Sequence, residues 1–188
     1  MPARRQRESY ADGRARRAAI DDLNLVLEAA LRFLEARQRS VSEVRRRLMT
    51  AGYREELVAG AIDRLGALGI LDDEAFTAAW VESRDRARPR GERALRRELS
   101  LKGIARALVD EAMVTRRPEP GGEADPDVVA AGRLLQRHAS QLARVADPRV
   151  RRQRAYALLA RNGFDSELAS TLSARLIDPN SSEVDREV

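Results

Sequence analysis

Cysteine is absent from this 188-residue chain, which excludes disulfide bonds, thiolate nucleophiles and cysteine-ligated metal sites. Aromatic residues make up only 4% of the sequence against 43% for all hydrophobic residues, so leucine, alanine, valine and isoleucine must fill any core. Leucine and alanine are strong helix formers, which favours an all-α fold. No apolar run approaches the ~20 residues that cross a bilayer. We therefore expect a cytoplasmic protein with no membrane partner.

Lysine is almost absent as well, because 34 of the 35 basic residues are arginine and the one lysine is Lys102. The net charge of +5 indicates a polyanionic partner such as nucleic acid. A GC-rich genome would produce the same arginine bias without any functional reason. The position of the charge along the chain is therefore more informative than its total.

Three segments of the chain share one pattern, in which a glycine follows a leucine by four residues and precedes another leucine by five. The triplets are Leu48–Gly52–Leu57, Leu99–Gly103–Leu108 and Leu159–Gly163–Leu168. Helical periodicity surrounds each glycine, and helix-start signals such as Ser40 with Glu43 precede it. The sequence predicts three tandem three-helix repeats. Because each repeat has a small core, the repeats should stack on one another and form an elongated molecule. Such stacking can also make the molecule curved.

The expected organisation follows from the composition of the intervening segments. We predict a basic flexible arm at 1–20, repeat 1 at 21–71, repeat 2 at 72–114, a linker at 115–125, repeat 3 at 126–177 and an acidic tail at 178–188. In the first helix, Leu27, Leu31 and Leu34 should face the core. The Pro- and Gly-rich linker should leave the third repeat more loosely attached than the others.

Positive charge gathers on the second helix of each predicted repeat, whereas the third helices are net negative. We predict that the basic clusters bind DNA or a protein partner through Arg45, Arg46, Arg93, Arg96, Arg97, Lys102, Arg149, Arg151, Arg152 and Arg154. Acidic third helices argue against a helix-turn-helix protein, whose last helix enters the major groove. The competing interpretation is that these arginines are ordinary solvated residues balanced by the acidic helices.

The sequence contains no convincing catalytic or metal site. His138 is the single histidine, and no second histidine or cysteine supports it as a zinc ligand or base. Asp72, Asp73 and Glu74 stand at a predicted helix start, where capping explains them better than Mg²⁺ binding. A phosphate-binding loop is missing, since Gly121-Gly122 lacks the accompanying Lys and Ser/Thr. We expect a protein that is not an enzyme and needs no cofactor or metal.

Several motifs between residues 25 and 177 occur together in one known family. They are Arg37 to Ser40 with Glu43, Leu71-Asp72-Asp73 with Phe76, Arg84, Gly91, Glu98-Leu99 and Lys102-Gly103-Ile104, and more weakly Arg161-Asn162-Gly163-Phe164. Through these motifs the chain resembles the RecX regulators of bacterial RecA recombinase. This resemblance implies tandem three-helix repeats that bind and restrain the RecA–DNA filament, and so modulate recombination, DNA repair and the DNA-damage (SOS) response. The implied partners are the RecA filament and single- or double-stranded DNA, with the chain itself a monomer.

An alternative class is a regulatory or architectural protein that binds nucleic acid without RecA. Strong duplex binding that ignores RecA would favour this alternative, and the dependence of binding on salt would help to separate the two.

Overall fold

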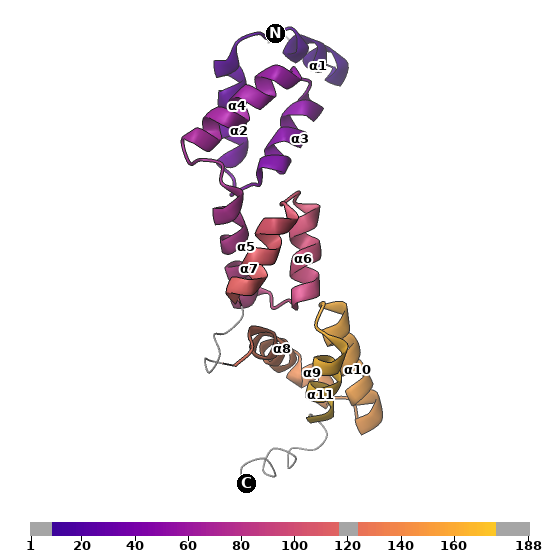
Figure 1. The fold of residues 1–188 in the computed structure, drawn as a ribbon. Coiled ribbons are helices and arrows are strands. Elements are labelled where there is room, and N and C mark those ends of the chain that lie inside the picture. The colour runs from indigo at the N-terminus through magenta and orange to yellow at the C-terminus, as the bar shows by residue number, and fades with distance from the viewer. Residues whose placement is uncertain (1–8, 117–123, 176–188) are drawn as a thin grey trace. The chain divides into compact units, whose positions relative to one another are not determined.

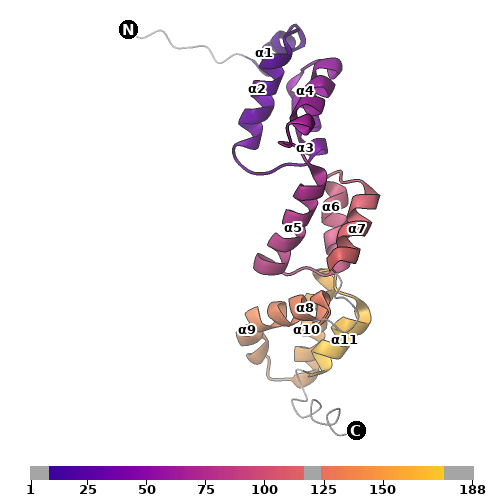
Figure 2. The same ribbon diagram turned by 60° about the vertical axis from the view of Figure 1, so that its left-hand side comes forward.

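The computed structural model describes residues 9–116 and 124–175, which form eleven helices and no strand (Figures 1 and 2). The predicted all-α class is confirmed. The helices are α1 (Tyr10–Ala18), α2 (Leu23–Leu34), α3 (Val41–Ala51), α4 (Glu55–Ala67), α5 (Asp73–Ala87), α6 (Glu92–Leu101), α7 (Arg106–Arg116), α8 (Pro126–Arg137), α9 (Ala139–Ala143), α10 (Pro148–Arg161) and α11 (Ser166–Arg175).

The chain forms two compact units. The first extends to Phe76 and includes Lys102–Ile104, and the second comprises Thr77–Leu101 together with the chain from Ala105 onward. The division therefore falls inside α5, a few residues after the predicted boundary between repeats at 71 and 72. The residues that we predicted to bind a partner are distributed over both units.

The first unit is a three-helix packing of α2, α3 and α4. Its core combines Val26 and Ala30 of α2 with Val44 and Leu48 of α3 and with Ala61, Ile62 and Leu65 of α4. Of the three expected inward residues of α2, Leu27 and Leu34 pack against this core, but Leu31 is 40% exposed and its neighbour Ala30 is fully buried instead. The predicted capping box is confirmed, since Ser40 and Glu43 each accept the other's backbone N–H.

The predicted flexible arm at 1–20 is partly wrong. Residues 10–18 form α1, whose N-cap Ser9 accepts a hydrogen bond from the Asp12 backbone N–H at 3.1 Å. The Tyr10 hydroxyl and the Arg17 guanidinium donate to the carbonyls of Thr50 and Ala51 at the end of α3, at 3.1 and 3.2 Å. Those unpaired helix-end carbonyls explain why a basic segment folds here. Residues 1–8 lie outside the described residues.

The second unit contains the rest of α5 with α6 and α7, followed by α8 to α11 (Figure 1). A continuous core joins α8, α9, α10 and α11 through Leu134, Leu135, Leu142, Leu159 and Ala169, with Phe164 from the turn between α10 and α11. The first helix of the third repeat is divided at His138, where α8 ends and the five-residue α9 begins. The third copy is therefore less regular than the first.

The three aligned glycines adopt the same left-handed backbone conformation. The φ angles of Gly52, Gly103 and Gly163 are 104°, 77° and 84°, a region that side chains beyond glycine rarely enter. Each glycine ends the second helix of its copy. This shared turn supports the repeat that the sequence pattern predicted.

The predicted linker at 115–125 begins too early, and the third repeat is not loosely attached to the second. Helix α7 continues to Arg116, and Asp125 caps α8, while residues 117–123 lie outside the described part of the chain, as do 176–188 with the predicted acidic tail. The guanidinium groups of Arg133 and Arg137 donate to the carbonyls of Asp85 and Ala87 at 3.1 and 2.6 Å. These bonds attach α8 to the C-terminal end of α5.

Candidate polyanion-binding surface

Lys102 is committed to an internal ion pair rather than exposed for binding. Its Nζ lies 2.8 Å from Oε1 of Glu43, and the two side chains are only 17% and 10% exposed. Arg37 contacts the same carboxylate at 3.0 Å. Burial acts to raise the pKa of Glu43, but the hydrogen bonds from Lys102, Arg37 and the Ser40 backbone outweigh it and lower the pKa to about 2. Lys102 thus stabilises the start of α3, and its predicted binding role is not supported.

Arg96 is also neutralised within the protein. Its guanidinium donates to Glu92 at 2.8 Å and to Asp110 of α7, and both bonds raise its pKa, that from Glu92 the more. The acidic third helix therefore balances this arginine, as the competing interpretation proposed. Charge reversal at Arg96 would place a third carboxylate beside Glu92 and Asp110, so the predicted binding role of Arg96 is not supported.

Two further predicted residues have internal partners. Arg93 lies 2.5 Å from Asp165, yet its side chain remains 67% exposed and accessible from solvent. The pKa of Asp165 is lowered, mainly by the backbone N–H of Glu167 and also by the charge of Arg93. Arg151 donates twice to the carbonyl of Val145, at 3.1 and 2.9 Å, which closes the turn before α10.

The other six predicted residues are exposed, and none forms an ion pair with another described residue. They are Arg45, Arg46, Arg97, Arg149, Arg152 and Arg154. Two of them lie in the first unit and four in the second. We refer to these six as the unpaired arginines.

In the first unit, Arg45 and Arg46 project from α3 on the side opposite the core residues Val44 and Leu48. Beside them, Arg47 and Arg39 both stack on the Phe33 ring, with 5.6 and 4.3 Å from guanidinium carbon to ring centroid.

The Arg39 Nε atom is buried and finds no hydrogen-bond partner in the described structure. The sequence pattern did not reveal this cluster, because its members come from two helices and the loop between them.

In the second unit, α6, α10 and the turn into α11 surround a hollow of about 270 Å³, which we call the α6–α10 pocket. Its lining includes Arg93, Arg97, Tyr156, Arg161, Phe164 and Ser166. Two of the ten predicted residues, Arg93 and Arg97, are thus brought together with Tyr156 and Arg161, which the sequence analysis did not select. A guanidinium fork binds phosphate or carboxylate in bidentate geometry, so this pocket suits an anion.

Helix α10 continues the basic surface away from the pocket. Arg152 stands one turn before Tyr156, and Arg149 precedes Arg152 by three residues, so all three share one helix face. Arg154 lies on another face, where it lines a separate hollow with His138 and Arg161. The predicted cluster on this helix therefore divides between two faces.

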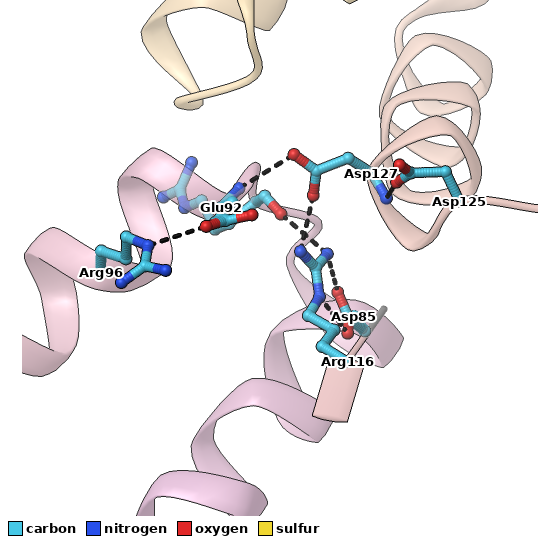
Figure 3. A network of polar contacts seen from close by, with 7 residues as sticks. Asp85, Glu92, Arg96, Arg116, Asp125 and Asp127 are labelled. Carbon is cyan, nitrogen blue, oxygen red and sulfur yellow. Dashed lines mark hydrogen bonds and ion pairs between the residues drawn. The ribbon is translucent and has the colours of Figure 1, made fainter. Parts of the chain in front are cut away.

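The junction of α5, α6, α7 and α8 is held by an internal network centred on Arg116 (Figure 3). Its guanidinium contacts Asp85 at 2.7 Å and Asp127 at 2.6 Å, and its side chain is only 8% exposed. Asp127 also accepts the Glu92 backbone N–H at 3.0 Å. The pKa of Arg116 is raised because these carboxylate hydrogen bonds outweigh burial, which alone would lower it. This network is structural, since the Arg116 guanidinium and the two carboxylates bond to groups of the protein itself.

The candidate metal and catalytic residues have structural roles where the chain is described. Asp72 accepts the backbone N–H groups of Glu74 and Ala75 at 2.8 and 2.9 Å, and so caps α5 as predicted. Asp73 accepts the Val41 N–H at 2.9 Å, and burial raises its pKa. Within residues 9–116 and 124–175, no group of three histidine or acidic side chains could hold a metal ion. None of the described helices is both long and apolar enough to cross a membrane.

Comparison with known proteins gives consistent results. Family models for the first and second three-helix domains of RecX match residues 27–65 and 72–113. A regulatory protein RecX from Mycolicibacterium vanbaalenii is 32% identical over 145 residues, covering 74% of this chain and 75% of the relative. The regulatory protein RecX of Chlorobium phaeobacteroides is 30% identical over 149 residues, covering 79% and 91%.

Two solved structures share the fold. A crystal structure of regulatory protein RecX matches with a TM-score of 0.64 at 22% identity, covering 88% of this chain and 73% of that one. RecX from Lactobacillus salivarius also matches with a TM-score of 0.64, at 20% identity and with 85% and 98% coverage. The sequence matches described above cover three-quarters or more of each RecX relative. They show that the chain belongs to the RecX family of regulatory proteins.

Proposed function

We propose that this chain binds the RecA–DNA filament and modulates RecA, mainly by inhibiting its recombinase and ATPase activities in recombination and DNA repair. The observation that supports the proposal most directly is the set of unpaired arginines, which occurs in both units. The family membership supplies the regulatory class. The proposal places the chain in the cytoplasm, as a monomer, with RecA and DNA.

The unpaired arginines can act by two related contacts. Each guanidinium can pair with a DNA phosphate or with a carboxylate on the surface of a filament protein. A single exposed pair of this kind contributes about 0–1 kcal/mol. Several contacts made by one chain to one filament reinforce each other through effective concentration. A weak but repeated interaction of this kind suits a regulator that must also dissociate.

The decisive experiment measures RecA ATPase and strand exchange as this protein is titrated in. Wild type should inhibit at near-stoichiometric amounts, and Arg45→Glu with Arg46→Glu should need several-fold more protein for the same inhibition. Arg64→Glu is the matched control, since Arg64 is exposed on α4 and lies outside the unpaired arginines. Absence of any effect of wild type at near-stoichiometric amounts contradicts the proposal.

The second candidate is a nucleic-acid-binding regulator that does not require RecA. The α6–α10 pocket supports it, because arginines beside a tyrosine can hold nucleic acid without another protein. In this case DNA binding should have a steep salt dependence, with a slope of about −0.9 in log K against log salt for each neutralised duplex phosphate. Tight DNA binding combined with no effect on RecA would favour this second function.

A further inference from the structure

The α6–α10 pocket carries more positive charge than its surroundings neutralise. Arg93 is paired with Asp165 at 2.5 Å. Arg97 and Arg161 line the same hollow, are exposed, and form no ion pair with another described residue. Two arginine charges are therefore available to a ligand, and arginine binds a phosphate group through two parallel N–H donors.

An aromatic ring stands in the wall of the same pocket. Tyr156 lies on α10 five residues before Arg161 and is 38% exposed, although aromatic side chains are scarce in this chain. Its ring is not needed to complete the core of the second unit, which is formed by other residues. A partly exposed tyrosine beside unpaired arginines is the combination on which unpaired bases stack.

The contact between α6 and the turn that ends α10, beside the pocket, is tightly packed. The Gly91 N–H donates to the carbonyl of Asn162 at 3.1 Å, and Arg90 donates to the Asn162 side chain. A Cβ atom added at Gly91 would lie 2.4 Å from the carbonyl oxygen of Gly163, and one added at Gly163 would lie 2.4 Å from the Cβ of Ala94. This close approach fixes α6 against the turn between α10 and α11. The arginines and the tyrosine are thus presented from a preformed arrangement.

We propose that the α6–α10 pocket binds one nucleoside phosphate unit, with the phosphate on Arg97 and Arg161 and the base stacked on Tyr156. The inference rests on the proposed function in one respect, namely that nucleic acid is the polyanion that this chain binds. The ligand is either an unpaired nucleotide in a single strand or a free nucleoside diphosphate or triphosphate. A duplex fits poorly, because its bases are already stacked inside the helix and cannot reach the tyrosine ring.

The test measures binding by fluorescence anisotropy, using labelled oligo(dT), a matched duplex and a labelled ATP analogue as separate ligands. Tyr156→Ala should weaken oligo(dT) binding about tenfold, within the range of alanine substitutions at stacking residues. Tyr156→Phe should retain most of the affinity, because the ring is kept. Arg97→Ala and Arg161→Ala should each weaken binding and reduce its salt dependence. Arg88→Ala is the matched control, an exposed arginine of the same unit outside the pocket, and should bind as wild type does.

The three ligands identify the source of the nucleotide. Preference for oligo(dT) assigns the pocket to single strands, and preference for the ATP analogue assigns it to free nucleotide. If Tyr156→Ala binds each of the three ligands as tightly as wild type does, and its circular dichroism spectrum is unchanged, the proposal is overturned.

If wild type binds nucleotide through Tyr156 but does not affect RecA, the pocket is upheld and the proposed function fails. If RecA inhibition survives in a Tyr156→Ala protein that binds nucleotide normally, the pocket proposal fails and the proposed function stands.

Discussion

At the scale of single residues, Arg116 is an arginine that stabilises the fold through internal ion pairs rather than one that is exposed to a partner. Replacing it with alanine would leave the half-buried carboxylates of Asp85 and Asp127 without their common partner. We expect Arg116→Ala to lower the free energy of unfolding by about 3–5 kcal/mol, as for other broken buried pairs. Chemical denaturation measures this change. Arg106→Ala, at a side chain 94% exposed and 3.6 Å from Asp110, should change it by less than about 1 kcal/mol. Similar losses in both variants would contradict the structural role of Arg116.

Glu43 should make the stability of the first unit depend on acid pH. Its folded-state pKa of about 2 lies below the ordinary value of 4.5, so the unfolded chain takes up a proton first as pH falls. The stabilisation is complete above about pH 4.5 and is lost as pH falls toward 2, with a total of about 3 kcal/mol. Denaturation measured between pH 5 and pH 2 should show this loss in wild type and a smaller one in Glu43→Gln. Parallel curves for the two proteins would show that Glu43 is not the group responsible.

At the scale of helices, the close approach of α6 to the turn before α11 depends on Gly91. Gly91→Ala should destabilise the second unit by about 1–3 kcal/mol, because the added methyl group overlaps the Gly163 backbone. Gly132→Ala is the matched control on α8, where an added Cβ meets no atom within 4 Å. That change should stabilise by about 0.5–1 kcal/mol through helix propensity. Thermal melting compares the two, and equal shifts would show that the contact at Gly91 is not tight.

The elements were predictable from the sequence to the extent that their signals are local. Ser40 with Glu43, Asp72 and the three aligned glycines each act within one helical turn, and the structure confirms them. Helix α1 was missed because its stability comes from contacts with the distant end of α3, through Tyr10 and Arg17. Tertiary contacts of that kind leave no periodic signal in a basic segment.

The candidate site was predictable only in part, for the same reason. The gathering of charge on the second helices selected Arg45, Arg46 and Arg97, and these side chains are exposed. The charge pattern could not show that Arg96 and Lys102 point toward carboxylates on other helices, at Asp110 and Glu43. The α6–α10 pocket joins residues more than fifty positions apart, so its tyrosine had no signal in the sequence.

At the scale of the whole molecule, the salt dependence of binding can show which unit contacts DNA. Each phosphate contact removed should reduce the slope of log K against log salt by about 0.7 on a single strand and about 0.9 on a duplex. If the first unit contacts DNA, Arg45→Ala with Arg46→Ala will lower the magnitude of the slope for DNA alone. If its arginines face carboxylates of RecA, the same variant will keep the DNA slope and lose affinity only for the filament. We expect the second result, because the pocket that suits a nucleotide lies in the second unit.

The second unit should give the opposite pattern. Arg149→Ala with Arg152→Ala should reduce the slope for oligo(dT) by about 1.4, since both arginines share a face with Tyr156 and two single-strand contacts are removed. Arg144→Ala is the control, because Arg144 is an exposed arginine of the same unit outside both the unpaired arginines and the α6–α10 pocket, and it should leave the slope unchanged. An equal loss of slope from Arg144→Ala would mean that the second unit contributes only diffuse charge. A slope that falls in the Arg149 and Arg152 variant but not in the control requires DNA to follow the Tyr156 face, which assigns nucleic acid to the second unit and leaves the first for the filament protein.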